Sequence, residues 1–250
     1  MIQLKSLDEI EMMRASGRIV GTILRDMGQL VRPGISTGEL DAFAEAKTRE
    51  MGAIPAFKGY HGFPGTVCIS VNDEVVHGIP STKRVLQDGD IVGLDFGVIY
   101  NGWYGDSART FAVGNIAESA QKLLDVTEQG LMKGIEQCKD GARLFDIGHA
   151  VQNFVEGHGY SVVREFVGHG IGRALHEDPQ VPNYGPRGKG IPLKVGMVLA
   201  IEPMINMGRP DVKVLKDGWT AVTCDRSLSA HFEHTVAITS TGPQILTLAQ

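Results

Sequence analysis

Acidic residues interrupt stretches of this chain that are otherwise apolar enough to form buried strands. Residues 90–114 predict two such strands, joined at residues 101–102 by Asn-Gly, a dipeptide typical of tight hairpin turns. With this turn, facing residues have numbers that sum to 203, so Asp106 faces Gly97. Asp95 lies two residues along on the same face, with its Cβ atom within about 7–8 Å of that of Asp106. The pattern predicts two carboxylates that reach one small volume.

A solvated sheet face is the alternative explanation for either aspartate alone. It suits the pair less well, because a strand such as IVGLDFGVI gains nothing in packing from an Asp. Two buried carboxylates cost several kcal/mol unless a cation neutralises them. We therefore expect a cation site at Asp95 and Asp106.

Four helices are predicted, a pair before each of two strand regions. Capping boxes of the form Ser-x-x-Glu begin the first two, at Ser6 and Ser36. The predicted helices extend over about residues 6–30, 36–52, 118–137 and 145–156.

The helix-helix-strand order occurs twice, and the two halves align at a constant offset of 107 residues. The alignment pairs Gly34 with Gly141, Gly52 with Gly159 and Gly89 with Gly196. It also sets Asp95 on Glu202, in the segment KVGMVLAIEP. With a longer insertion, Asp106 corresponds to Glu233 in HFEHTVAI. A chance alignment is the alternative, but an acid that matches an acid twice in apolar strands favours an internal duplication.

The duplication predicts an α+β fold of two halves, about residues 1–115 and 116–250, related by a pseudo-twofold axis. Their curved antiparallel sheets would meet at the centre, with the helices outside. The equivalent carboxylates would then come together. No Ser/Pro-rich linker separates the halves, so we expect a single catalytic domain over residues 1–250.

Composition narrows the class of protein. The 250 residues are 42% hydrophobic and 21% charged, which suits a globular core. The net charge of −5 gives no basic footprint, so direct nucleic-acid binding is not expected. Three widely spaced cysteines suit a reducing compartment and lack zinc-site spacing. The N-terminal segment lacks a signal-peptide pattern and no stretch approaches 18 apolar residues, so we expect a cytoplasmic protein without membrane association.

Four carboxylates at one point carry a charge near −4, which two divalent cations would balance. Two metals about 3.5–4 Å apart lower the pKa of a shared water and polarise the carbonyl that it attacks. One imidazole among oxygen ligands shifts the preference from Ca²⁺ toward Mn, Fe, Co or Zn. His169, in the glycine-rich segment VGHGIGRALHEDP, is the candidate, with His176 seven residues later. A lone histidine is more often structural, so His77 in NDEVVHGIP is a weaker candidate by itself.

Five segments, in order and over nearly the whole chain, resemble type I methionine aminopeptidases. The segments are CISVNDEVVHGIP, LDFGVIYNGWYGDSA, GHGIGRALHEDP, AIEPM and HFEHTV. The resemblance implies the pita-bread fold and a two-metal site. Asp95, Asp106 and Glu233 would hold one metal. Asp106, His169, Glu202 and Glu233 would hold the other, with Asp106 and Glu233 bridging.

The resemblance also implies roles for residues outside the ligand set. His77 and His176 match the family's catalytic histidines, which contact the scissile amide and the developing oxyanion without binding metal. Glu202 would be catalytic as well as a ligand. Asn72 and Ser229 match a minor monovalent-cation site.

The family's methionine pocket carries over in part. Tyr60, Cys68 and Trp219 stand where the family has methionine-contacting residues. Phe63 and Leu175 stand where some members have Tyr and Phe, so fewer ring and hydroxyl contacts would loosen the pocket. His77 and His176 would also border it. A surface turn is the alternative for Trp219, because DGWTAVTCD is polar.

The implied activity is removal of the initiator methionine from nascent proteins and peptides when the next residue is small. We expect a monomer, and association with the ribosome, although no basic patch marks a docking face. The sequence leaves the identity of the metals open.

Four alternatives remain at this point. Prolidase and aminopeptidase P share the metal scaffold but usually carry an additional N-terminal domain. Type II methionine aminopeptidases carry a helical insertion late in the chain, and none is visible. A binding module that lost its metals predicts substituted ligands, whereas all five are present. An uncommitted metal store would need neither His77 nor His176.

Overall fold

The computed structural model describes residues 2–249. Its helices are α1 (Leu7–Leu30), α2 (Thr37–Glu50), α3 (Glu118–Ile135) and α4 (Leu144–Gly157), with a short 3₁₀ helix at Tyr60–Gly62. The four predicted helices are confirmed to within two residues at each end. Both capping boxes form as expected, because the Ser6 and Ser36 hydroxyls each accept a hydrogen bond of 3.2 Å from the backbone N–H three residues later.

The strands of the first half are β1 (Ile54–Pro55), β2 (Val67–Val71), β3 (Glu74–Val76), β4 (Ile91–Tyr100) and β5 (Trp103–Ala112). Those of the second half are β6 (Ser161–Val162), β7 (Gly168–Gly170), β8 (Glu177–Val181), β9 (Val198–Ile201), β10 (Met204–Asn206), β11 (Val212–Val214), β12 (Ala221–Thr223), β13 (Ser229–His231), β14 (His234–Thr239) and β15 (Gly242–Ile245). All of the pairings between these strands are antiparallel.

Two main sheets carry the two halves. In the first, β4 pairs with β5 along one edge and with β2 and β1 along the other. The second has the order β15-β14-β9-β7-β8, and two three-stranded sheets, β13-β10-β6 and β11-β12-β3, complete the structure. The predicted hairpin is confirmed, with Gly97 opposite Asp106. Asn101 and Gly102 both have positive φ, of 52° and 76°, as the two-residue turn requires.

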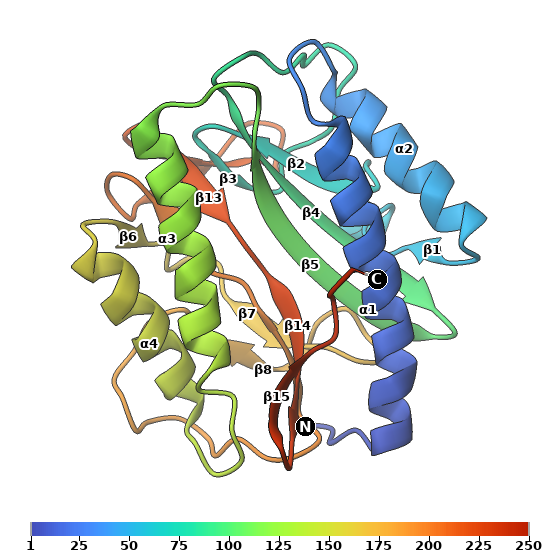
Figure 1. The fold of residues 1–250 in the computed structure, drawn as a ribbon, viewed down its shortest axis with the longest axis vertical. Helices are drawn as coiled ribbons and strands as arrows, with labels where there is room; N and C mark the ends of the chain where they lie inside the picture. The colour runs from blue at the N-terminus through green and yellow to red at the C-terminus, as the bar shows by residue number, and fades with distance from the viewer. Residues whose placement is uncertain (1, 250) are drawn as a thin grey trace.

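The duplication is visible in the backbone. Figure 1 shows α1 and α3 as the inner pair of helices, with α2 and α4 outside them, arranged about an approximate twofold axis. Isolated bridges join Ser36 to Val85 and Arg143 to Pro192, at the predicted offset of 107 residues. Gly34 and Gly141, which the offset pairs, both adopt left-handed backbone, with φ of 92° and 82°. Two long-range bridges and two backbone conformations that recur at one offset support an internal duplication.

One predicted equivalence is wrong. Met204 pairs with His231 and Ile201 with His234, which sets Glu202 opposite Glu233. Asp95, the counterpart of Glu202, instead faces Ala108. Glu233 therefore corresponds to Ala108, and Asp106 corresponds to His231.

Hydrogen bonds show the corrected equivalence independently. Asp106 exchanges two backbone hydrogen bonds with the Thr235 hydroxyl, of 3.2 and 2.7 Å. His231 makes the same two bonds with the Thr110 hydroxyl, of 2.9 and 3.0 Å. The predicted match was two residues out. Side chains two residues apart in a strand point to the same face, so Glu233 lies on the face that corresponds to that of Asp106 in either alignment.

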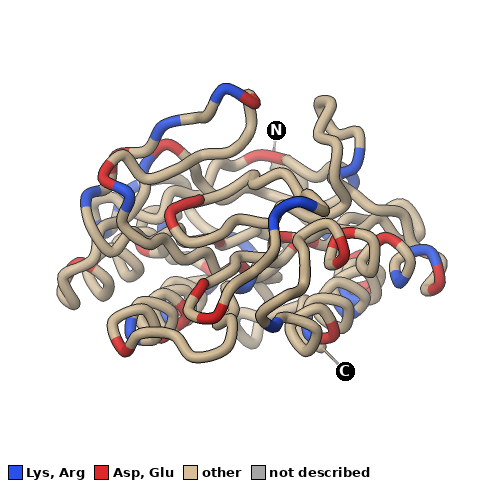
Figure 2. The backbone as a smooth tube through the Cα atoms, turned by 90° about the horizontal axis from the view of Figure 1, so that it is seen from above, with Lys and Arg blue, Asp and Glu red and all other residues tan. Residues whose placement is uncertain are grey.

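Each half has its own apolar core. One core gathers α1, α2 and the strands of the first sheet, and the other gathers α3, α4, β9 and β14. A third cluster at the join includes Phe57, Phe63, Cys68 and Leu175. Figure 2 shows the helices toward one side of the molecule and strands and loops on the other, with positive and negative positions interspersed. Within residues 2–249, no helix is both long and apolar enough to cross a membrane.

Candidate active site

All twelve predicted ligand, catalytic and pocket residues line one cavity of about 260 Å³. They are Tyr60, Phe63, Cys68, His77, Asp95, Asp106, His169, Leu175, His176, Glu202, Trp219 and Glu233. None of these residues belongs to α1–α4, so the cavity is built from strands, the loops between them and the 3₁₀ helix at Tyr60–Gly62. The structure thus brings together residues that are up to 173 positions apart in the chain, from Tyr60 to Glu233.

Each predicted metal ligand comes from a strand or a strand end. Asp95 lies in β4, Asp106 in β5 and His169 in β7, while Glu202 follows β9 directly and Glu233 lies between β13 and β14. The two halves are joined at this point, because the Glu233 N–H donates to the carbonyl of the residue opposite Asp95, at 2.8 Å. Adjacent antiparallel strands fix the directions of their side chains, so the fold holds these groups in place without a ligand.

The ligand atoms converge. His169 Nε2 lies 3.9 Å from Asp106 Oδ2 and 3.5 Å from Glu202 Oε1. One ligand atom each from Asp106, His169 and Glu233 lie within 4.8 Å of one another. These spacings suit atoms that share a metal ion more than atoms that hydrogen-bond directly.

A backbone contact sets the tautomer of His169. Its Nδ1 lies 2.9 Å from the carbonyl oxygen of Gly170, which can only accept, so Nδ1 carries the proton. Nε2 then presents its lone pair to the carboxylates. A metal-ligating histidine commonly has this arrangement, with one nitrogen held by a carbonyl and the other free for the ion.

Burial shifts every titratable group of the cluster toward its neutral form. It raises the pKa of Asp95 to about 7. Burial, and then the neighbouring carboxylates, raises the pKa of Asp106, Glu202 and Glu233 well above the usual values. Burial lowers the pKa of His169 to about 3, so its ring is neutral and available as a ligand.

Orphaned oxygens show that the residues fit a metal. Asp95 Oδ1, Asp106 Oδ1 and Glu233 Oε1 are buried and have no hydrogen-bond partner among residues 2–249. Buried polar atoms are nearly always partnered, and three carboxylate oxygens without donors around one point are the donor set of a divalent cation.

The two predicted catalytic histidines flank this cluster. The His176 ring lies 4.3 Å from the His169 ring, and its Nδ1 is 2.8 Å from the Tyr60 hydroxyl. The hydroxyl can donate to Nδ1, which leaves Nε2–H as a donor into the cavity. His77 has positive φ, of 60°, and its ring packs edge-on against Trp219 at 6.4 Å.

Comparison with known proteins identifies the family. Residues 11–240 match metallopeptidase family M24. Methionine aminopeptidase 1 of Bacillus subtilis is 56% identical over 247 residues, which cover 99% of each chain. The chain belongs to family M24.

Solved structures of this family superpose closely on the chain. The methionine aminopeptidase from Rickettsia prowazekii gives a TM-score of 0.98 at 45% identity, covering 99% of this chain and 100% of the other. The prolidase from Pyrococcus horikoshii gives 0.79 at 25% identity, and only 64% of its length is covered. The predicted pita-bread metallopeptidase is confirmed, and the similarity to methionine aminopeptidases is greater in both identity and coverage.

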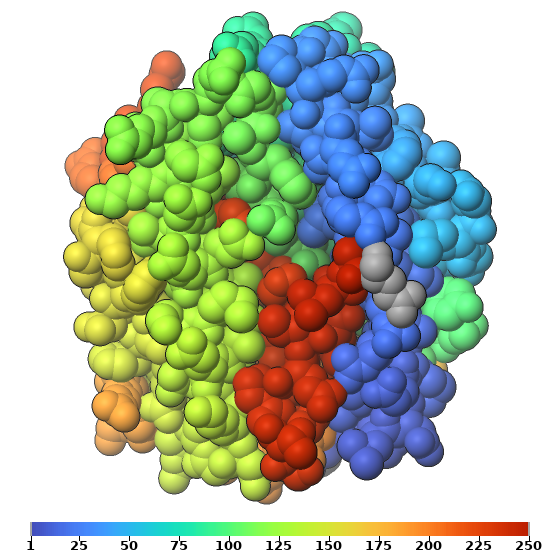
Figure 3. All heavy atoms as spheres, viewed as in Figure 1, coloured from blue at the N-terminus to red at the C-terminus, as the bar shows by residue number. Residues whose placement is uncertain are grey.

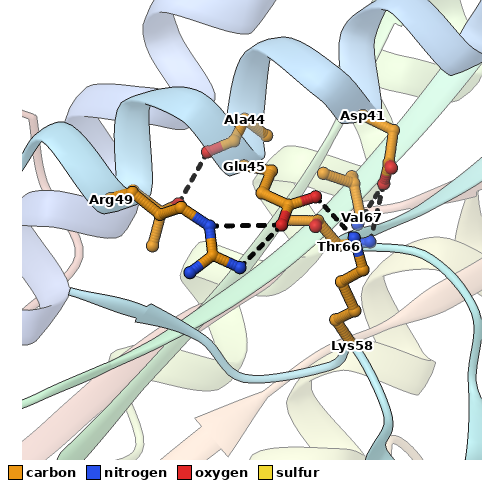
Figure 4. A network of polar contacts seen from close by, with 8 residues as sticks. Asp41, Ala44, Glu45, Arg49, Lys58, Thr66 and Val67 are labelled. Carbon is orange, nitrogen blue, oxygen red and sulfur yellow. Dashed lines mark hydrogen bonds and ion pairs between the residues drawn. The ribbon is translucent and has the colours of Figure 1, made fainter.

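Two partly buried polar contacts hold the loops that this M24 chain places around the cavity. Asp41 of α2 accepts hydrogen bonds from the backbone of Thr66 and Val67, at 2.7 and 2.9 Å, next to Cys68 (Figure 4). Lys5 forms an ion pair with Glu177, the neighbour of His176, and both side chains are largely buried.

Asn72 and Ser229, the predicted monovalent-cation pair, do not line the cavity. Their backbones do meet, because the Ser229 N–H donates to the Asn72 carbonyl at 2.9 Å. The Asn72 amide is already engaged, as it donates to Asp90 and accepts from Ile91.

Three residues near the site escaped the sequence analysis. Phe57 and His61 line the cavity, and Phe57 continues the aromatic spacing of three through Tyr60 and Phe63. That spacing was a usable signal. His231 lies 3.8 Å from Glu202, and the two-residue misalignment concealed it.

A second cavity, of about 660 Å³, lies on the helix side between α1, α3 and the C-terminal hairpin, where Figure 3 shows the surface hollowed. It is larger, but its Arg109 and Glu128 pair with each other at 3.2 Å. The smaller cavity contains the converging carboxylates and histidines with shifted pKa values and unpaired oxygens, which are typical of an active site.

Proposed function

We propose that this chain removes the N-terminal methionine from peptides and nascent proteins whose second residue is small. The observation that carries the proposal is the lining of the cavity. Tyr60, Phe63, Cys68, Leu175 and Trp219 form a largely apolar wall in the same cavity as the carboxylate cluster. An unbranched apolar side chain fits against such a wall, while the carboxylates favour a free α-amine beside it.

Two divalent ions are proposed for the cluster, chosen from Co²⁺, Mn²⁺, Fe²⁺ and Zn²⁺. Asp95, Asp106 and Glu233 would hold one, and Asp106, His169, Glu202 and Glu233 the other. The orphaned carboxylate oxygens and the His169 tautomer support this assignment. Bound ions supply a water of lowered pKa and polarise the scissile carbonyl.

The residues of the chain provide binding, orientation and proton transfer. His77, which lines the cavity, is proposed to contact the scissile amide. His176 donates Nε2–H to the oxyanion, while the Tyr60 hydroxyl holds its Nδ1. Glu202 takes the proton of the attacking water and returns it to the leaving amine.

The cellular setting is proposed from the substrate. The whole span of residues 1–250 acts as one catalytic domain and as a monomer. It works in the cytoplasm on chains that emerge from the ribosome, with which it associates. Cys68, Cys138 and Cys224 are all free thiols, which supports a reducing compartment. Asn72 and Ser229 are proposed to hold one monovalent cation.

A peptide panel tests the activity. Met-Gly, Met-Ala and Met-Ser peptides should lose methionine, whereas peptides with Leu or Arg second should be cleaved far more slowly. Norleucine in place of methionine should cost only about 1–3 kcal/mol, because one apolar group changes. Formylation of the amine should block cleavage. Efficient hydrolysis of X-Pro dipeptides with indifference to Met would overturn the proposal in favour of a prolidase.

A further inference from the structure

His231 is a buried histidine at the centre for which the proposed mechanism has no use. It ends β13, and only 4% of its surface is exposed. Both of its backbone polar groups bond to the Thr110 hydroxyl, and it pairs with Met204 across the sheet. The strand therefore fixes the position of the ring, so the fold itself sets the surroundings of the two ring nitrogens.

The duplication places His231 at a chemically significant position. It is the counterpart of Asp106, since the two residues make the same pair of hydrogen bonds with Thr110 and Thr235. One half thus directs a carboxylate at the centre from this position, and the other half directs an imidazole.

The ring points at Glu202. His231 Nε2 lies 3.8 Å from Glu202 Oε2, while His169 Nε2 lies 3.5 Å from Glu202 Oε1. Each oxygen of this carboxylate therefore faces one imidazole. His231 Nε2 is buried and has no hydrogen-bond partner among residues 2–249. An orphaned nitrogen this close to a carboxylate oxygen is one small rotation from a hydrogen bond.

We propose that His231 is a positioning residue that donates Nε2–H to Glu202 Oε2 and so keeps Oε1 turned toward His169. The inference rests on the proposed function of Glu202 as a ligand and proton carrier. A neutral donor orients a carboxylate without cancelling its charge, which stays available to the metal. Because the oxygen has two lone pairs, Oε2 can accept this bond and still take a proton.

The donor can be removed or replaced at similar size. His231→Leu keeps an apolar side chain of comparable bulk and has no donor. His231→Gln keeps an amide N–H at about the reach of Nε2. His234→Leu is the matched control, because His234 is partly buried, bonds Thr247 and lines the cavity on the helix side.

Mn²⁺ titration of metal-free protein by calorimetry is the main readout, followed by turnover of Met-Ala-Ser. We expect His231→Leu to bind the same number of ions about 10–100-fold more weakly and to lose kcat with little change in KM. His231→Gln should recover most of both, and His234→Leu should bind Mn²⁺ as the wild type does.

Other outcomes overturn the inference. Fewer bound ions in His231→Leu would mean that His231 is a metal ligand. Wild-type affinity for Mn²⁺ in that variant would mean that the His231 side chain only fills space in the core. If His231→Leu does not fold, His231→Asn replaces it, since its shorter amide cannot reach Glu202. Wild-type protein that binds no Mn²⁺ would instead refute the proposed function, which separates the two failures.

Discussion

Burial acts in opposite directions on the acids and the histidines of the centre, and it neutralises both. It raises the pKa of Asp95 to about 7 and lowers the pKa of His169 and His231 to about 3. Without metal, the carboxylates therefore retain protons that they would lose in water. Metal binding must displace these protons, which makes affinity for the ion fall as the pH falls.

Asp106→Asn should make the metal-free protein more stable at neutral pH. Burial raises the pKa of Asp106 well above 3.8 in the folded state, so the folded protein holds a proton that the unfolded chain releases above about pH 4. This carboxyl therefore lowers the free energy of unfolding as the pH rises, and the amide does not. Urea unfolding in chelator should show the advantage of the variant growing from near zero at pH 4 toward pH 8.

The comparison with wild type matters because the buried histidines have the opposite effect. Their lowered pKa values make the unfolded chain bind more protons below about pH 6.5, so they add stability as the pH rises. Subtracting the free energy of unfolding of the wild type from that of the variant removes the contribution of the histidines, which both proteins share. Added Mn²⁺ should reverse the order of the two proteins and leave Asp106→Asn inactive. An advantage of the variant that does not change with pH would contradict the assignment.

Among the contacts between elements, the buried ion pair that joins the N-terminal segment to the start of β8 has the clearest consequence. Only 4% of the Lys5 side chain and 13% of the Glu177 side chain are exposed. Glu177 also accepts the backbone N–H of Arg173 at 2.8 Å, so it organises the loop that carries His176. The segment before α1 thereby supports the cavity from a distance in sequence.

Lys5→Met should destabilise the protein by about 3–5 kcal/mol, because it leaves the Glu177 charge buried without its partner. Loosening of the loop should also lower kcat for Met-Ala-Ser. Lys133→Met is the control, since its ion pair with Glu136 is about half exposed and its loss should change the free energy of unfolding by no more than about 0.5 kcal/mol. Equal unfolding midpoints for the two variants would show that the buried ion pair between Lys5 and Glu177 does not stabilise the fold.

Elements with local signals were predictable from the sequence. The capping boxes at Ser6 and Ser36 and the turn at residues 101–102 are set by neighbours in the chain, so their geometry could be read directly. Pairing between β9 and β14 depends on a long insertion with no local signal. A shift of two residues there leaves the same faces buried, which is why the predicted counterpart of Asp106 in the second half, Glu233, was wrong.

At the scale of the whole molecule, the duplication explains why the cavity is central. Two halves with the same order of helices and strands meet where β5 lies beside β13 and β14, with the helices toward one side of the molecule (Figures 1 and 2). The sequence predicted that Asp95, Asp106, Glu202 and Glu233 would gather, because acids in apolar strands are rare, while the family resemblance supplied the residues of the apolar pocket. It did not predict Phe57 and His61, whose position depends on how the loop at residues 57–63 folds over the join.

We expect the gathered carboxylates to hold metal, and we expect this metal to be required for the release of methionine. The most direct measurement is turnover of Met-Ala-Ser by thoroughly metal-free protein as Mn²⁺ is added back anaerobically, with bound metal counted in parallel. We expect no turnover at first and a rise that follows the bound metal, reaching a plateau at about two ions per chain. Full turnover by the metal-free protein would contradict the account.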